Sequence, residues 1–258
     1  MSISDAYSAT GVAWRDGPER VYQRLADELV AASPVPLAGQ RVADVGSGTG
    51  AASRSIARAG GRPIALDLAL GMLTVDQATR PAAVVADARR LPLATASCAA
   101  VVAAFSFNHV PDPELALADA ARVVGPDGAV LASAYATDDT HPVKEAVDRA
   151  AAEAGWVAEP WIAEMKGHSV PVLATVDGAS AVCEAAGLHA DVQQIDVTFP
   201  ELDAADLVTW RLGMAQVAPF VATLSASAVE QLRHHALDLL GPEPEVLVRR
   251  MIVICART

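Results

Sequence analysis

The sequence predicts an α/β protein with a Rossmann-like, doubly wound sheet, and three observations support that prediction. Apolar runs of strand length alternate with helix-forming runs from Gln40 to Ala136, as in sheets that helices cover on both faces. The first apolar run passes directly into a glycine-rich turn and then a helix, Val42–Gly50. A later run, Cys98–Phe105, is apolar throughout, which is typical of a central strand buried on both faces.

Glycine and proline residues mark the ends of the helices and strands in this alternating part. Gly60 and Gly61 end the helix after the glycine turn, and the tight turn Gly125–Gly128 precedes the fifth strand. With these limits we expect strands over 41–45, 63–67, 83–86, 98–105 and 129–135. We expect helices over 16–32, 51–59 and 112–124, and a short helix that includes Met72 and Leu73.

The regular alternation weakens after the fifth strand. Helical patterns cover 143–154 and 176–186, strand patterns cover 192–199 and 246–257, and longer insertions occupy 137–175 and 203–240. We expect one domain over 1–258, with an N-terminal helical lid segment (1–36), a cofactor-binding core (40–136) and the two insertions as substrate caps. All four tryptophans lie outside the core, so these outer segments bury aromatic surface.

Composition excludes several classes of protein. The chain has 258 residues, 52% hydrophobic residues and a formal net charge of −12, which argues against a nucleic-acid surface and against docking on anionic membranes. The three cysteines form no CxxC pair, so no metal site is expected. No secretory signal and no membrane-length apolar run are found, so we expect a cytoplasmic protein with a small-molecule substrate. The oligomeric state is left open, a homodimer included.

The glycine turn by itself fits more than one cofactor. Gly46, Gly48 and Gly50 satisfy a dinucleotide fingerprint as well as other nucleotide-like sites. Acidic residues narrow the choice, because Asp44 precedes the turn and Asp67 and Asp87 end the next two strands. Carboxyl ends of parallel strands meet at the edge of the sheet where such folds bind ligands. Three carboxylates are therefore expected around one crevice.

With these motifs the chain resembles the class I S-adenosylmethionine-dependent methyltransferases, in particular the small-molecule branch of ubiquinone and menaquinone biosynthesis. The resemblance rests on Val42–Gly50, Ala65–Leu73, Ala86–Pro92 and Gly125–Leu131, and so covers the core. It implies a seven-stranded, mostly parallel sheet with an antiparallel last strand, which 246–257 can supply. It also implies S-adenosylmethionine as cofactor and S-adenosylhomocysteine as product.

The resemblance assigns cofactor roles residue by residue. Asp44 matches the acid behind the amino-acid end of the cofactor, Asp67 the acid that takes both ribose hydroxyls, and Asp87 with Ala88 the pair that receives the adenine amino group. The remaining matches are Gly46, Ser47, Gly48, Gly50, Leu68, Met72, Phe105 and Ser106. Simpler roles stay open at this point: Asp67 as a helix cap, Asp87 as a turn acid, and the glycines as a tight turn alone.

Catalytic and substrate residues are predicted from their places in the chain. His109 follows the fourth strand, near the expected methyl-transfer zone, and is the candidate base; His141 and His168 are the alternatives. For the substrate pocket we expect Tyr7, Trp14, Trp156, Trp161, Met165, His168, Trp210 and Met214. The competing interpretation is that the aromatic residues are ordinary core of the caps, and that Tyr7 and Trp14 only anchor the N-terminal segment.

Together these features predict an enzyme that transfers a methyl group from S-adenosylmethionine to a small, fairly apolar metabolite in secondary or cofactor metabolism. The acceptor atom, oxygen, nitrogen or carbon, is left open. One alternative is a cyclase or isomerase that binds the same cofactor on the same fold. The other is an NAD(P)-dependent oxidoreductase, which is disfavoured because Tyr135 is followed four positions later by Asp139 and not by the lysine of a Tyr-x-x-x-Lys pair.

Overall fold

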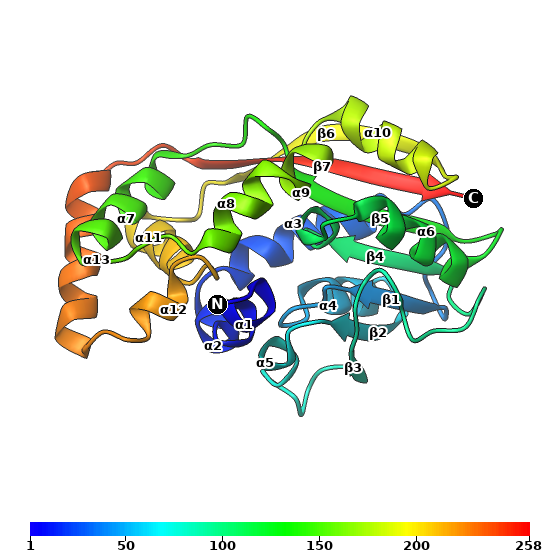
Figure 1. Cartoon of the computed structure of the whole chain (residues 1–258), viewed down its shortest axis with the longest axis horizontal. Helices are drawn as coiled ribbons and strands as arrows, with labels where there is room; N and C mark the ends of the chain where they lie inside the picture. The colour runs from blue at the N-terminus through cyan, green and yellow to red at the C-terminus, as the bar shows by residue number, and fades with distance from the viewer.

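A single seven-stranded sheet forms the centre of the molecule, with strand order β3-β2-β1-β4-β5-β7-β6. The computed structural model describes residues 1–258. Strands β1 to β5 are parallel, and β7 lies antiparallel between β5 and β6, which confirms the predicted fold class (Figure 1). The strands are β1 Arg41–Val45, β2 Arg62–Asp67, β3 Ala83–Val85, β4 Ala100–Ala104, β5 Ala129–Tyr135, β6 His189–Phe199 and β7 Leu247–Arg257.

Helices cover both faces of this sheet. Those of the N-terminal segment and core are α1 Ile3–Ser8, α2 Gly11–Asp16, α3 Glu19–Ala31, α4 Ala51–Arg58, α5 Leu70–Leu73, the 3-10 turn η1 Phe107–His109 and α6 Pro113–Val124. Those of the C-terminal part are α7 Pro142–Glu153, α8 Pro160–Gly167, α9 Ser169–Val172, α10 Val176–Ala185, α11 Ala204–Leu212, α12 Ala218–Val221 and α13 Ala226–Leu240. No helix is long and apolar enough to span a bilayer.

The strands divide their side chains between two hydrophobic cores because successive residues point to opposite faces. Val42 and Val102 join the core under α3 and α4, whereas Ala43 and Val101 join the core under α6 and α10. The first of these cores continues into the insertions, where Leu207 of α11 is fully buried. Helices α7, α11 and α13 pack on one another beyond the end of the sheet (Figure 1).

The N-terminal segment differs from its prediction. Instead of one helix over 16–32, the chain forms α1, α2 and α3, and α2 ends at Asp16 before a break at Gly17 and Pro18. Proline cannot donate an amide hydrogen to a preceding helical turn, so the helix restarts after it. Of these helices, α1 and α2 lie beside α5, whereas α3 packs beside α4 on the face of the sheet (Figure 1).

Strand β4 is shorter than the apolar run 98–105 that predicted it. It ends at Ala104 because Phe105 adopts a left-handed backbone conformation, with φ of 54°. That conformation is costly for a residue with a side chain and is typically found at functional sites. The next residue, Ser106, packs so closely on Gly46 that any side chain at Gly46 would overlap it. The ends of β1 and β4 are therefore in direct contact.

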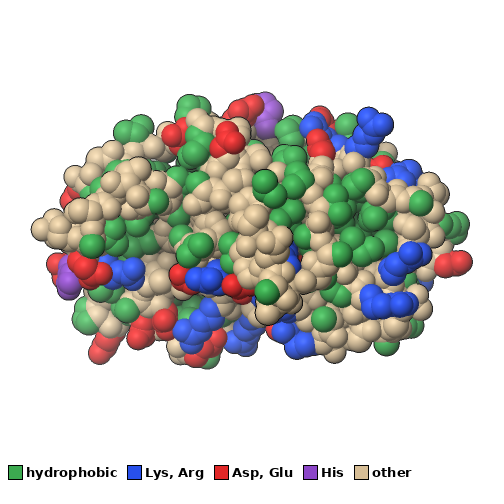
Figure 2. All heavy atoms as spheres, turned by 90° about the horizontal axis from the view of Figure 1, so that it is seen from below, with side chains coloured by type: hydrophobic (Ala, Val, Ile, Leu, Met, Phe, Trp, Pro, Cys, Tyr) green, Lys and Arg blue, Asp and Glu red, His purple; other side chains and the backbone are tan.

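The surface carries charges of both signs. On the face seen in Figure 2, acidic and basic side chains occur among apolar ones, and no continuous basic patch is seen.

Candidate active site

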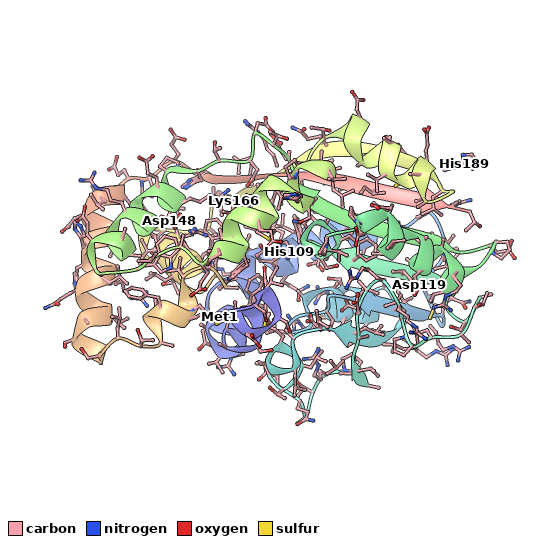
Figure 3. The ribbon with its side chains drawn as sticks, viewed as in Figure 1. Met1, His109, Asp119, Asp148, Lys166 and His189 are labelled. Atoms are coloured by element: carbon pink, nitrogen blue, oxygen red, sulfur yellow. The ribbon has the colours of Figure 1, made fainter.

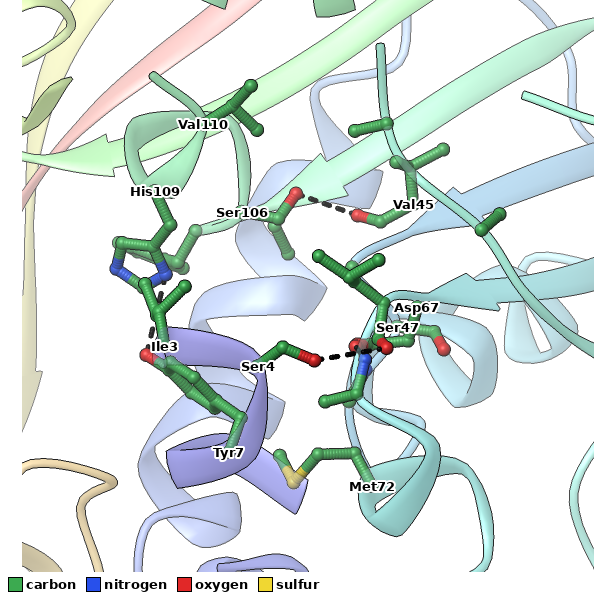
Figure 4. A pocket seen from close by; sticks show the side chains of 18 of the residues that line it. Ile3, Ser4, Tyr7, Val45, Ser47, Asp67, Met72, Ser106, His109 and Val110 are labelled. Atoms are coloured by element: carbon green, nitrogen blue, oxygen red, sulfur yellow. Dashed lines mark hydrogen bonds between the residues drawn. The ribbon is translucent and has the colours of Figure 1, made fainter. Parts of the chain in front are cut away.

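A cavity of about 350 Å³ opens at the carboxyl ends of β1, β2 and β4, within the range of ligand-binding pockets. Figure 4 shows the side chains that line it. Of the predicted site residues, it brings together Tyr7, Trp14, Gly46, Ser47, Gly48, Asp67, Leu68, Met72, Asp87, Ala88, Phe105, Ser106 and His109. The cavity therefore unites segments that are separated by a hundred residues in the sequence.

Backbone amides and one arginine hold the glycine loop in place. The amides of Gly46 and Ser47 both donate to the carbonyl of Leu66, at 2.7 and 3.0 Å. On the other side, Arg80 donates from Nη2 to the carbonyl of Gly48 at 3.1 Å. Ser106 ties the loop to β4, because its hydroxyl donates to the carbonyl of Val45 at 2.7 Å (Figure 4). The loop is thus rigidly positioned at the cavity floor.

Asp67 ends β2 with its carboxylate on the cavity. One oxygen accepts from the amide of Gly48 at 2.7 Å and the other from the amide of Ala69 at 2.8 Å. Burial raises the pKa of this carboxyl, while the amide bonds act against that shift. Ala69 precedes α5, so the carboxylate does not bond an amide of the helix's first turn, as a helix cap would. Each oxygen keeps a lone pair for a ligand hydroxyl.

Asp44 lies behind the loop and does not line the cavity. Its Oδ2 accepts from the hydroxyl of Ser53 at 2.6 Å, while its Oδ1 is buried without a hydrogen-bond partner. Burial raises the pKa of Asp44 to about 7. An unpaired buried carboxylate oxygen is costly, so this atom marks a place where a cationic donor would be stabilising.

Asp87 sits on the exposed rim of the cavity. Arg89 donates to it from Nη2 at 2.8 Å and from its backbone amide at 2.9 Å. The side-chain bond from Arg89 lowers the pKa of Asp87. This local turn is the arrangement expected of a turn acid, and Ala88 and Arg89 line the cavity beside it.

An aromatic wall closes the side of the cavity opposite the glycine loop. Tyr7, Trp14 and Tyr22, one from each N-terminal helix, follow one another with ring centroids 5.7 and 4.7 Å apart. Phe105 joins the wall 5.4 Å from Tyr22. Its left-handed backbone aims this ring along the wall. The wall leaves an apolar surface for a ligand.

His109 ends η1 and lies directly beside Tyr7 on the wall of the cavity (Figure 4). The Tyr7 hydroxyl lies 3.4 Å from Nδ1 of His109. Burial lowers the pKa of His109 to about 4 and raises that of Tyr7 well above 10. The imidazole is therefore neutral at pH 7, and burial makes it a weaker base than an exposed histidine. His109 lies near the middle of the molecule, whereas His189 lies at its far edge (Figure 3).

The helices α1 and α2 close over the cavity by docking on the segment after β2. Ser4 donates from its hydroxyl to the carbonyl of Leu68 at 3.3 Å. Gly71 of α5 packs against the backbone of Ser8 so closely that a side chain there would overlap it. The helices α1 and α2 are thus docked on the segment after β2 and on α5, and Ala6 of α1 also packs against Trp161 and Met165 of α8.

The remaining predicted residues lie outside the cavity. Gly50, at φ of 102°, precedes the first residue of α4. Trp156 donates to the carbonyl of Gln216 at 3.1 Å. Trp161 and Met165 pack with Ala6 in a small core of their own, His168 is exposed, and Trp210 and Met214 are buried in the main core. His141 caps α7, because its Nδ1 accepts from the amide of Val143 at 3.2 Å.

Sequence reasoning missed several residues that line the cavity: Ile3, Ser4, Tyr22, Arg89, Val110 and Pro111. Val110 and Pro111 directly follow His109 and could have been found from it. Tyr22 falls in a helix whose apolar spacing indicates core packing, and it does pack against the core as well as the cavity. Ile3 and Ser4 carry no sequence signal, because their position depends on how α1 docks.

Comparisons with known proteins agree with this geometry. Residues 43–132 match the sequence model of a family described as a methyltransferase domain. A demethylmenaquinone methyltransferase of Renibacterium salmoninarum is 37% identical over 142 residues, 54% of this chain and 56% of that relative. One from Clavibacter sepedonicus is 30% identical over 151 residues, 57% of this chain and 60% of that relative. The chain thus spans less than two thirds of the length of these relatives.

A solved structure shows the same fold. Haemonchus contortus phosphoethanolamine N-methyltransferase 2, in complex with S-adenosyl-L-methionine, has a TM-score of 0.59 and 17% sequence identity. The match covers 99% of this chain and 57% of that one. The resemblance inferred from the sequence motifs is confirmed by the family match and by the relatives.

Proposed function

We propose that this chain, whose core is a class I methyltransferase domain, transfers a methyl group from S-adenosylmethionine to a small, apolar acceptor. The observation that carries the proposal is the single cavity onto which the glycine loop, Asp67 and Asp87 converge. That convergence lies within residues 43–132, the part that matches the methyltransferase family. The relatives named for demethylmenaquinone support an apolar, ring-containing acceptor.

The residues present fit this cofactor. Asp67 has lone pairs directed at the cavity for two ribose hydroxyl donors, and Leu68 and Met72 line the cavity for an adenine ring. Asp44, buried behind the glycine loop and bonded to Ser53, would support the part of the loop that holds the amino-acid end of the cofactor. Asp87 and Ala88 sit at the rim, where the adenine amino group would lie. Ser47 and Gly48 complete the loop.

The cofactor supplies a methyl group that is already activated on a sulfonium. What the protein contributes is position and exclusion of water. Phe105 and Ser106 place the end of β4 against the glycine loop, and the aromatic wall shields the cavity from solvent. His109, neutral at pH 7, accepts the proton from an acceptor that loses one, and the Tyr7 hydroxyl beside Nδ1 orients the ring.

Calorimetry and product analysis test the proposal together. We expect S-adenosylhomocysteine to bind with micromolar or tighter affinity and NADPH to show no binding. Incubation with S-adenosylmethionine and a panel of naphthoquinols and phenols should yield S-adenosylhomocysteine and a product heavier by one methylene. Binding of NADPH in place of S-adenosylhomocysteine would overturn the cofactor assignment. Turnover of an acceptor without S-adenosylhomocysteine formation would support the cyclase or isomerase alternative.

A further inference from the structure

A second polar cluster lies beyond the aromatic wall, at the start of β7. Because β7 is antiparallel to β5, its first residues lie beside the carboxyl end of β5. This is the end of the parallel strands at which the cavity opens. Arg249 is there with only 2% of its surface exposed. Its guanidinium lies 3.9 Å from the ring centroid of Tyr135 and 4.8 Å from that of Trp210. The proposed function uses none of these three side chains.

Several donors in this cluster have no partner. Arg249 donates from Nη2 to Asp139 at 2.7 Å, but its Nε and Nη1 are buried without an acceptor. The Tyr135 hydroxyl and the Trp210 Nε1 are also buried and unpaired. Buried polar groups in proteins are nearly always hydrogen-bonded, and each one left unpaired costs about 1–3 kcal/mol. Four such atoms in one place indicate a missing acceptor.

The cluster also has an excess of positive charge. Asp139 accepts from Arg249, from Lys144 at 2.8 Å and from the amide of Arg250. Arg211 of α11 is paired with Asp148 of α7, at 2.6 and 2.8 Å. Burial and then Arg249 lower the pKa of Lys144 to about 8, so it is still mainly cationic at pH 7. Three cations face two carboxylates, and one negative charge would balance them.

We propose that Arg249, with Tyr135 and Trp210, is a binding subsite for a carboxylate carried by the methyl acceptor. A carboxylate is ionised at neutral pH without help from the protein, and its two oxygens accept from several donors at once. The identification of this ligand as the acceptor rests on the proposed function. Tyr22 and Phe105, the rings between the subsite and the cavity, favour a ligand whose remaining part is apolar.

Tyr22 connects the subsite to the cavity. It lines the cavity, and its ring centroid lies 6.1 Å from that of Tyr135. Phe105, which also lines the cavity, is 4.3 Å from Tyr135. Arg249, Tyr135 and Trp210 do not line the cavity, so a ligand whose carboxylate reaches Arg249 has to displace the Tyr22 ring. It then lies along the wall, with its other end near His109. Arg249 would thus hold the carboxylate end of the methyl acceptor, while the end that receives the methyl group lies near His109.

The test compares a carboxylate with its neutral isostere on the whole protein saturated with S-adenosylhomocysteine. The probes are 2-naphthoate and 2-naphthamide, titrated by calorimetry. We expect wild type to bind naphthoate at least tenfold more tightly than naphthamide, and Arg249→Met to remove that preference, since hydrogen bonds to charged groups contribute about tenfold or more. The matched control is Arg250→Met, the exposed neighbour on β7, which should keep the preference.

Arg249→Met should still fold, because Asp139 retains Lys144 and the amide of Arg250 as partners. A second variant, Tyr135→Phe, removes only the unpaired hydroxyl and should weaken naphthoate binding severalfold. Equal binding of the two probes by wild type, no binding of naphthoate, or a preference that survives both substitutions overturns the subsite. Failure of the proposed function is a separate result, namely that S-adenosylhomocysteine alone does not bind, and the two probes are then titrated on the unliganded protein.

Discussion

The two carboxylates around the glycine loop have different surroundings and therefore different roles. Asp67 is held by two backbone amides and faces the cavity, whereas Asp44 is buried behind the loop with one oxygen unpaired. The first geometry suits neutral hydroxyl donors, and the second suits a cation. The residue types and spacing predicted both acids, but only the fold distinguishes the one on the cavity from the one behind it.

Replacing Asp67 by Asn should weaken cofactor binding by about 1–3 kcal/mol, because a charge-assisted acceptor becomes a neutral amide. Calorimetry with S-adenosylhomocysteine measures the change. Asp127→Asn, in the exposed turn after α6, is the control and should bind as wild type does. An unchanged affinity for Asp67→Asn would remove this residue from the ribose role.

Asp44 should make the unliganded protein less stable as pH rises. Its pKa is raised from 3.8 to about 7, so the folded state binds more protons than the unfolded state between these values. The free energy of unfolding therefore falls over that window, by at most about 4 kcal/mol. His109, with its lowered pKa, acts in the opposite direction between about 4 and 6.5.

The contribution of Asp44 is thus measured as a difference between wild type and Asp44→Asn. Urea unfolding at pH 5 and pH 8 should show that the variant loses less stability than wild type on going to the higher pH. The same loss in both proteins would mean that Asp44 does not titrate in this range.

His109 is expected to matter for turnover and not for cofactor binding. His109→Ala should lower kcat by about 10²–10⁴-fold for an acceptor that must lose a proton. Its affinity for S-adenosylhomocysteine should be close to that of wild type. Tyr7→Phe, which removes only the hydroxyl near Nδ1, should have a smaller effect. A rate unchanged in His109→Ala would limit this residue to positioning.

At the scale of elements, the N-terminal segment with α1 and α2, predicted as a lid, is the part that sequence reasoning described least well. Strands β1 and β5 begin and end where expected. A glycine-rich turn directly follows β1, and the tight turn Gly125–Gly128 directly precedes β5. Residues 3–16 have no long apolar repeat, and their two helices form where they dock on α5. Trp156, Trp161 and Trp210 were expected at the ligand but lie outside the cavity, since an aromatic residue in an insertion fits a core as well as a pocket.

The proposed lid can be tested by loosening the packing of α1 on α5 without changing a residue that lines the cavity. Gly71→Ala places a methyl group where the backbone of Ser8 now lies, so α1 must move away from α5. We expect faster amide hydrogen exchange over residues 3–16 and weaker binding of S-adenosylhomocysteine. Gly167→Ala, at the end of α8 with open space around it, is the control. Unaltered exchange in Gly71→Ala would show that the lid is held by other contacts.

At the scale of the whole molecule, one hydrophobic core joins the sheet to the helices of both insertions. Val102 of β4 and Leu207 of α11 belong to the same buried cluster. Residues of the N-terminal segment, of the sheet and of both insertions therefore share one core. Sequence periodicity located the insertions but could not show that α7, α11 and α13 pack on one another, because that contact joins segments far apart in the chain.

A single cooperative unfolding transition should follow from this shared core. Leu207→Ala, at a fully buried position, should lower the free energy of unfolding by about 2–5 kcal/mol. Far-ultraviolet and near-ultraviolet circular dichroism should report the same shifted midpoint. Leu115→Ala, on the exposed side of α6, should change stability by about 0.5 kcal/mol or less. Two separate transitions would show that the insertions unfold independently.

The aromatic wall has a practical consequence. Trp14 is the one tryptophan that lines the cavity, and it lies 4.7 Å from Tyr22, the ring that a long ligand would push aside. The protein thus carries its own optical reporter at the place where binding would be felt. Ligand occupancy can be followed by intrinsic tryptophan fluorescence, without a dye or a label. The Trp14→Phe variant gives the fluorescence of the other three tryptophans, which is subtracted from that of wild type.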